Sequence, residues 1–127
     1  MGPTITAAVS EYLTECRFRR FQFGVWDCAL FVADVLELCT GRDFAAGLRG
    51  TYESREGYLA ALPAPLHELP AHFGLTPCVP QNGAVWWLPG PNPEGGMGIF
   101  WQGRLLQPGR RGLRDVTRDI STITFYQ

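Results

Sequence analysis

The sequence predicts one α+β domain in which helices precede an antiparallel sheet. Between residues 4 and 62, apolar side chains recur at the three- and four-residue spacing of amphipathic helices. Beyond Gly74, short apolar runs alternate with turns rich in Gly, Pro and Asn, which is typical of strands. The chain has 127 residues, 46% of them hydrophobic and 13% aromatic, which suits a single globular domain with a sizeable core. Helices followed by strands, instead of alternating with them, indicate the α+β class.

Two helices are expected in the first third of the chain. Residues 4–16 place apolar side chains on one face, and a basic turn with three arginines follows them. Residues 28–39 are apolar nearly all round, so we expect this segment to be the buried central helix. Thr40 and Gly41 supply its C-terminal stop.

A shorter helix is expected over residues 53–62, where apolar side chains again share one side. Three prolines between residues 63 and 70 then leave room for at most one helical turn around 66–69. Four strands should complete the domain as an antiparallel meander. We expect these strands at residues 84–88, 97–101, 104–107 and 120–126.

The turns between these strands carry their own signals. Gln102 and Gly103 stand between two apolar runs and indicate a tight hairpin, whereas residues 108–112 should form a loop. Trp86 and Trp87 are adjacent in a strand and must therefore point to opposite faces of the sheet. One of them should enter the core, and the other should meet solvent or a partner.

Charge and cysteine content exclude several classes of function. The net charge of −1 provides no global field toward nucleic acid or membrane, and no apolar run reaches the ~20 residues of a membrane span. No secretory signal is expected. The sequence has no C-x-x-C spacing, and Cys28 and Cys39 would lie ~16 Å apart on one helix, so we expect no metal and no cofactor. Three cysteines should be buried free thiols: Cys16, Cys39 and Cys78.

The most informative segment is the approach to the central helix. Asp27 occupies the N-cap position, where its carboxylate accepts an otherwise unpaired backbone N–H, and Gly24 permits a tight entry of the chain. Cys28 follows at the positive end of the helix dipole, which favours the thiolate and should lower the thiol pKa. The sequence therefore places a nucleophile-like thiol at a helix N-terminus.

This segment resembles the NlpC-type papain-like cysteine peptidases, bacterial and phage enzymes that cut cell-wall peptides. The corresponding pieces are Phe21-Gln-Phe-Gly24, Asp27-Cys28-Ala29-Leu30, Asn82-Gly83 with the strand that follows, Gly96-Met-Gly-Ile-Phe100 and Leu105-Leu-Gln107. The resemblance implies a papain-like fold, with Cys28 as nucleophile and Gln107 as the third polar residue.

The departures from that family's pattern concern its acid–base groups. The histidine base of the peptidases would fall at Gly96, their tyrosine at Phe21, and the aspartate of their Gly-Asp strand at Ala84. General acid–base help is typically worth 10²–10⁴-fold, so peptide hydrolysis without it should be very slow. We therefore expect Cys28 to be a vestigial nucleophile.

A narrower resemblance links the chain to small proteins encoded among phage tail genes. It rests on the Phe-x-x-Gly-x-x-Asp-Cys segment together with Leu48-Arg-Gly-Thr-Tyr52. It implies a structural role in a bacteriophage tail or tail tip, location in the virion after synthesis in the host cytoplasm, and other tail proteins as partners. Cleft or partner contacts could then come from Trp26, Tyr52 and Trp87, although the bulk of Trp26 also suits a core position.

Two other functions remain open from the sequence. In the first, the protein is an active cysteine endopeptidase or amidase acting on peptidoglycan, with His67 or His72 as the only candidate bases. In the second, it binds anions or nucleic acid through the basic stretch Arg110–Arg118. Asp115 and Asp119 interleave with those arginines, so a salt-bridged surface without nucleic acid is the favoured interpretation.

Overall fold

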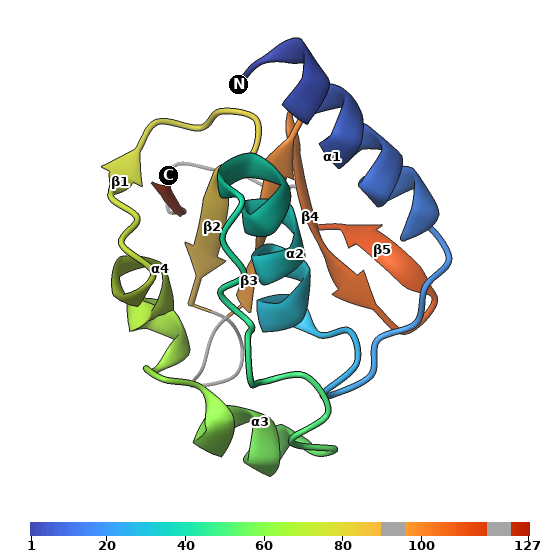
Figure 1. Ribbon diagram of the computed structural model, residues 1–127, viewed down its shortest axis with the longest axis vertical. Coiled ribbons are helices and arrows are strands. Elements are labelled where there is room, and N and C mark those ends of the chain that lie inside the picture. Colours follow the sequence, from blue (N-terminus) through green and yellow to red (C-terminus); the bar gives the residue numbers. More distant parts are fainter. Residues whose placement is uncertain (90–95, 117–122) are drawn as a thin grey trace.

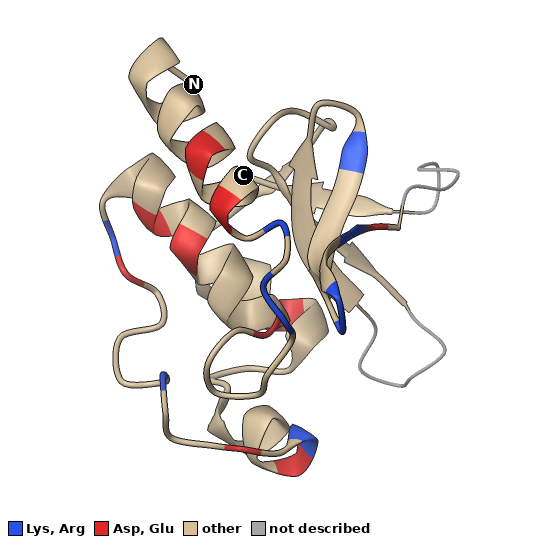
Figure 2. Cartoon of the chain, turned by 90° about the vertical axis from the view of Figure 1, so that its right-hand side faces the viewer, with Lys and Arg blue, Asp and Glu red and all other residues tan. Residues whose placement is uncertain are grey.

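The α+β class is confirmed by a computed structural model, which describes residues 1–89, 96–116 and 123–127 (Figure 1). In these residues helices come first and an antiparallel sheet follows. Two long helices, α1 and α2, lie side by side against the sheet, and the shorter helices lie toward one end of the molecule (Figures 1 and 2). The helical elements are α1 (Pro3–Glu15), α2 (Cys28–Thr40), α3 (Arg55–Ala61), the 3-10 turn η1 (Leu66–Glu68) and α4 (Leu69–His72).

Helix α2 is the buried central helix that the sequence predicts. It is packed between α1 and strand β3 (Gly96–Trp101), and most of its side chains are buried. Gly41 ends it in the left-handed conformation with φ of 78°, and its N–H returns to the carbonyl of Glu37. Both boundaries therefore follow from local signals in the sequence.

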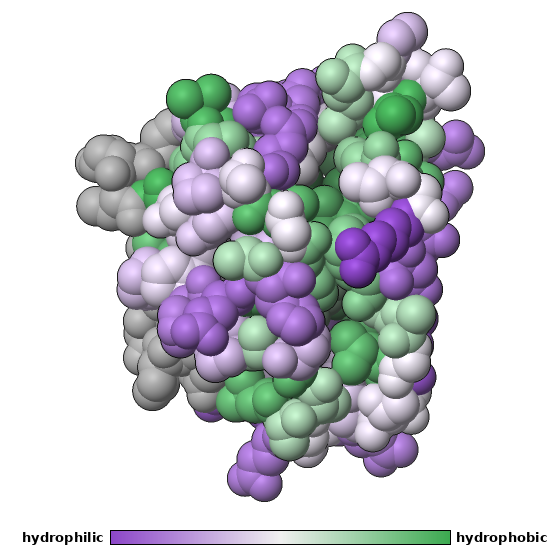
Figure 3. All heavy atoms as spheres, turned by 60° about the vertical axis from the view of Figure 1, so that its left-hand side comes forward, coloured by the Kyte–Doolittle hydropathy of each residue, from purple (hydrophilic) through white to green (hydrophobic). Residues whose placement is uncertain are grey.

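The segment after α3 is more helical than the prolines suggest. Leu66–Glu68 forms a 3-10 turn that continues directly into α4, where Pro70 occupies one of the first two helical positions. A proline is tolerated there because the N–H that it lacks would have no intrahelical partner. The prediction of at most one turn was wrong for this reason. The surface on this side of the molecule mixes polar and apolar residues (Figure 3).

The six strands form one antiparallel sheet in the order β1-β6-β2-β3-β4-β5. A simple meander would place the last strand at an edge, but β6 lies between β1 and β2. The predicted meander is therefore correct only from β2 to β5. The strands are β1 (Pro77–Cys78), β2 (Val85–Leu88), β3 (Gly96–Trp101), β4 (Arg104–Gly109), β5 (Gly112–Asp115) and β6 (Thr124–Tyr126).

Strands β1 and β5 are not expected from the sequence. β1 has only two residues, Pro77 and Cys78, and they pair with Tyr126 and Phe125 of β6, which lie more than 40 residues further along the chain. The segment predicted as a loop over 108–112 is the end of β4, a tight turn and the start of β5. The Gln102–Gly103 hairpin is confirmed, with φ of 48° and 79° at its two turn residues. The first part of the predicted last strand falls on residues 117–122, outside the described residues.

Each face of the sheet carries its own hydrophobic cluster. Val85 and Ile99 pack toward α2, in the cluster that also contains most of that helix. Trp86 points to the opposite face and is 1% exposed, in a second cluster with Leu105 and Phe125. Trp87 returns to the helix side and is half-buried. Trp86 is thus the tryptophan that enters the core, whereas Trp87 keeps part of its surface exposed.

No helix in the described ranges is long and apolar enough to cross a membrane.

Candidate functional site

The N-terminus of α2 is organised by the carboxylate of Asp27, which is fully buried. It accepts hydrogen bonds from the backbone N–H of Leu30 at 3.0 Å, the N–H of Gly24 at 3.1 Å and the hydroxyl of Tyr52 at 2.6 Å. The predicted N-cap is thus confirmed, and two further donors use the same group. Asp27 therefore joins the helix start, the approach segment and the loop that contains Tyr52.

Gly24 marks the point where two chain segments cross. Its φ is +80°, and a Cβ built on it would lie 2.0 Å from the backbone carbonyl oxygen of Tyr52. The carbonyl of Gly24 also accepts a hydrogen bond from the N–H of Gly50 at 2.8 Å. Only glycine combines that backbone conformation with so close an approach.

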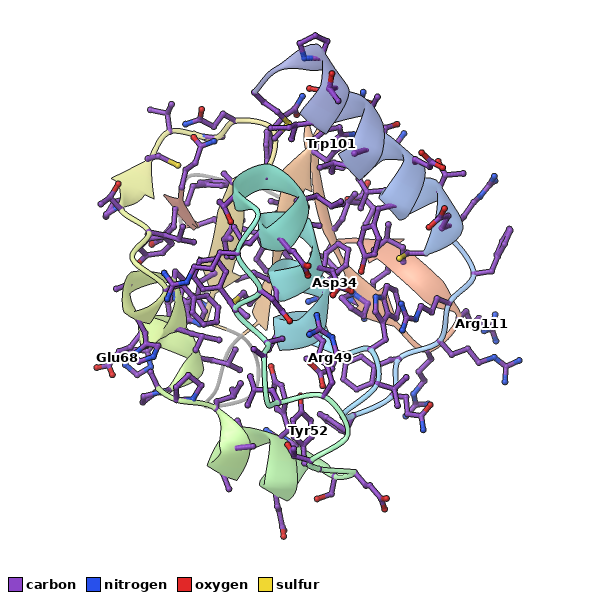
Figure 4. The ribbon with its side chains drawn as sticks, viewed as in Figure 1. Asp34, Arg49, Tyr52, Glu68, Trp101 and Arg111 are labelled. Carbon is purple, nitrogen blue, oxygen red and sulfur yellow. The ribbon has the colours of Figure 1, made fainter. Side chains whose placement is uncertain are left out.

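The 48–52 segment is tied to α2 at a second point. Arg49 donates to Asp34 on α2 at 2.7 Å and forms two hydrogen bonds with Asp43, at 3.0 and 3.1 Å (Figure 4). Asp34 in turn accepts a hydrogen bond from Tyr12 of α1 at 2.6 Å. Arg49 therefore serves the packing of the helices and does not border Cys28, whereas Tyr52 lies beside the N-cap.

Cys28 is half-buried, and its sulfur accepts a hydrogen bond from the side-chain amide of Gln107, with Nε2 3.9 Å from Sγ. Burial and the negative charge of Asp27 raise the pKa of the Cys28 thiol to about 12, against weaker opposing effects from the backbone of Met97 and from Arg114. The sequence-based expectation of a lowered pKa was wrong. That expectation rested on the helix N-terminus alone, whereas desolvation and the adjacent carboxylate of Asp27 have the larger effects on the thiol pKa.

Gly96 lies next to this pair. A Cβ at position 96 would be 3.6 Å from Nε2 of Gln107 and 3.7 Å from the ring of Trp86, both ordinary contacts. The tertiary structure thus brings Cys28, Gly96 and Gln107 together from α2, β3 and β4. A longer side chain at position 96 would start beside the amide that contacts the thiol.

Tyr58 is a site residue that the sequence analysis missed. Its side chain is 5% exposed, and its hydroxyl is buried without a hydrogen-bond partner in the part of the chain that the structure describes. Burial, then repulsion by Cys28 and Asp27, raises the pKa of this hydroxyl well above its usual value, while the nearby backbone of Ala29 favours ionisation without forming a bond of good geometry. The apolar pattern of α3 identifies Tyr58 as a packing residue, but nothing in it indicates the proximity to Cys28.

The two histidines lie elsewhere, on η1 and α4, and both are exposed. His67 is 3.7 Å from the carboxylate of Glu68, and its ring centroid lies 6.1 Å from that of Trp87. His72 has its ring next to Phe73, 6.2 Å between centroids. Within the described ranges, neither imidazole forms a hydrogen bond with Cys28.

The remaining predicted contact residues divide between core and site. Trp26 is fully buried and donates from Nε1 to the hydroxyl of Tyr12 at 3.2 Å, so it belongs to the core and not to a cleft. Phe21 packs edge-on against Phe23, with centroids 4.9 Å apart. The indole N–H of Trp87 is buried without a partner among the described residues. All four cysteines are free, with only Cys16 fully buried, and no group suited to a metal ion occurs in the described ranges.

The raised pKa predicts how the Cys28 thiol responds to pH. The pKa of this thiol rises from its ordinary value of 9.0 to about 12 in the folded protein, because the fold favours the neutral thiol over the thiolate. The resulting contribution to the free energy of unfolding is complete below pH 9.0 and is lost as the pH rises from 9.0 through about 12. The rate of Cys28 alkylation by iodoacetamide, followed by peptide mass spectrometry, should keep rising beyond about pH 10, since only the thiolate reacts. A rate that reaches its plateau near neutral pH, well before that of N-acetylcysteine, would contradict the raised pKa.

Fold and site together define an α+β protein with a free cysteine at the start of a buried central helix. Residues 3–125 match the family described as a domain of unknown function (DUF6950), and the chain belongs to that family. No curated protein and no solved structure matches the chain.

Proposed function

We propose that this protein is a structural component of a bacteriophage tail or tail tip, built on a papain-like frame that no longer hydrolyses peptides. The observation that supports the proposed loss of hydrolytic activity is the environment of the Cys28 thiol. Among the described residues, the side chain that hydrogen-bonds its sulfur is the amide of Gln107, which neither accepts nor releases a proton at neutral pH. A cysteine hydrolase needs a base to generate the thiolate and an acid to protonate the leaving amine.

The link to tail proteins rests on the two sequence segments that resemble them. These segments, around Gly24-x-x-Asp27 and Leu48–Tyr52, contact each other through the Gly24–Gly50 backbone hydrogen bond and the Asp27–Tyr52 hydrogen bond. Their joint occurrence in the sequence therefore has a physical basis, since each supports the conformation of the other. Retention of this unit beside an inactive thiol favours a role in which the frame itself is used.

Restoring an imidazole at position 96 tests the proposed loss of the base. Gly96→His should raise the alkylation rate of Cys28 at pH 7 by at least about tenfold, because an imidazole beside the thiol favours the thiolate. The parent protein should not hydrolyse muropeptides at an enzymatic rate. Gly96→Gln is the matched control, since it adds a polar side chain of comparable size without a titratable group.

Two results would overturn the proposal. Cleavage of muropeptides by the parent protein, abolished in Cys28→Ser, would identify a working hydrolase. Equal alkylation rates in Gly96→His and Gly96→Gln would show that position 96 is not the base position of a papain-like site.

A further inference from the structure

Two basic segments that are far apart in the sequence meet on one surface. The turn after α1 carries Arg17, Arg19 and Arg20, and the turn between β4 and β5 carries Arg110 and Arg111. The N–H of Phe21 donates to the carbonyl of Gly109 at 3.0 Å, and a Cβ on Gly112 would lie 2.1 Å from the carbonyl oxygen of Arg17. The two turns are therefore in direct backbone contact, as Figure 2 shows. We call these five exposed arginines the arginine surface.

The arginine surface lacks compensating charge within the described residues. None of its five guanidinium groups has a carboxylate within ion-pair distance there, and Asp115, which the sequence analysis assigned to this stretch, lies 3.9 Å from Arg104. Arg118 and Asp119 fall outside the described residues. Phe18 stands among these arginines with 76% of its surface exposed, and the guanidinium of Arg17 lies 5.1 Å from its ring centroid. Arginine and aromatic side chains are the types enriched at protein–protein interfaces.

An opposite charge lies on the neighbouring helices. A groove of about 640 Å³ runs between α1 and α2. Its exposed carboxylates, Glu11, Glu15 and Glu37, have no cation within ion-pair distance among the described residues. The guanidinium of Arg49 pairs with Asp34 and Asp43 instead. Acidic segments of α1 and α2 and the basic turns are visible from one side in Figure 2, and Arg111 projects away from the body of the protein in Figure 4. We call this feature the acidic groove; its lining residues are Ala8, Glu11, Tyr12, Glu15, Asp34, Glu37, Leu38 and Gly41.

We propose that two copies of this chain associate through these surfaces, with the arginine surface of each copy against the acidic groove of the other. Because both surfaces are visible from one side of the molecule, a two-fold arrangement could form the contact twice. Complementary charges of this kind steer association and set the register of an interface. A nucleic acid is the less favourable partner, since the net charge is −1 and the carboxylates of the groove would repel phosphates.

The inference goes beyond the proposed function and does not depend on it. A working hydrolase could form the same contact, and an inactive tail protein could lack it. The residues of the arginine surface and the acidic groove lie on α1, α2 and two turns, whereas the proposed loss of activity concerns Cys28, Gly96 and Gln107. Failure of one proposal would therefore leave the other standing.

Paired charge reversals test the contact on the full chain by sedimentation velocity. Arg110→Glu/Arg111→Glu and Glu11→Arg/Glu15→Arg should each weaken self-association at least tenfold, because like charges then face each other. An equimolar mixture of the two variants should associate again, since each reversed surface meets its complement. Association of the parent protein should weaken between about 0.1 M and about 1 M salt, where the Debye length falls from about 10 to about 3 Å.

The matched control is Glu53→Arg/Glu68→Arg, which reverses two exposed charges outside both surfaces and should leave association unchanged. Circular dichroism and thermal melting would verify that all variants fold. The proposal is overturned if the parent protein stays monomeric at all concentrations, if either reversed variant associates like the parent, or if the mixture fails to associate. It is also overturned if a single-stranded oligonucleotide binds the monomeric parent through Arg110 and Arg111.

Discussion

Replacing Gly24 with alanine is expected to destabilise the protein by about 3–5 kcal/mol, because two separate costs add at this position. The left-handed conformation costs a residue with a Cβ about 1–2 kcal/mol. The remainder comes from displacement of the 48–52 segment, because the new Cβ would meet the carbonyl oxygen of Tyr52 at 2.0 Å. Urea denaturation followed by circular dichroism would measure the free energy of unfolding.

Gly41→Ala separates the two contributions. Gly41 has nearly the same φ, 78°, but a Cβ on it would meet no heavy atom within 4 Å. The Gly41→Ala substitution should therefore lower the free energy of unfolding only by the cost of the left-handed backbone conformation, about 1–2 kcal/mol. Equal losses of stability in the two variants would show that the crossing at Gly24 has room for a side chain.

Asp27→Ala is expected to cost about 2–4 kcal/mol, two- to fourfold more than a typical N-cap substitution. An ordinary cap satisfies one N–H, whereas this buried carboxylate serves the N–H of Leu30, the N–H of Gly24 and the hydroxyl of Tyr52. Removing it leaves several buried donors unpaired, and each unsatisfied donor costs about 1–3 kcal/mol before any relaxation. Denaturant unfolding at constant pH would measure the loss.

Ser54→Ala on α3 provides the reference for that variant. Ser54 also caps a helix, with its hydroxyl accepting from the N–H of Gly57 at 3.1 Å, but it is exposed and makes this single cap contact. Its loss should cost about 1 kcal/mol. Tyr52→Phe completes a double-mutant cycle with Asp27→Ala, and a coupling energy below about 0.5 kcal/mol would show that the short Asp27–Tyr52 hydrogen bond does not stabilise the fold.

The elements that could be predicted from the sequence are those with local causes. The start of α2 follows from the cap chemistry of Asp27, its end from Gly41, and the β3–β4 hairpin from two turn residues that accept positive φ. Strand β1 escaped prediction because it is short and pairs with a strand distant in sequence. Strand β5 escaped because Arg110 and Arg111, which form its turn with β4, are not residues that signal a tight hairpin. The position of β6 between β1 and β2 depends on the same long-range pairing.

For the site, the sequence by itself determined that a cysteine begins a capped, apolar helix and that glycine occupies position 96. Only the tertiary structure decided the chemistry of that cysteine, because burial, which is the largest cause of the raised pKa, and the amide of Gln107 reach the sulfur through folding. The same holds for Tyr58, which reaches the site from α3, and for the arginine surface, which two separate turns assemble. Local propensity acts over a few residues, whereas desolvation and charge proximity depend on which distant segments the fold brings together.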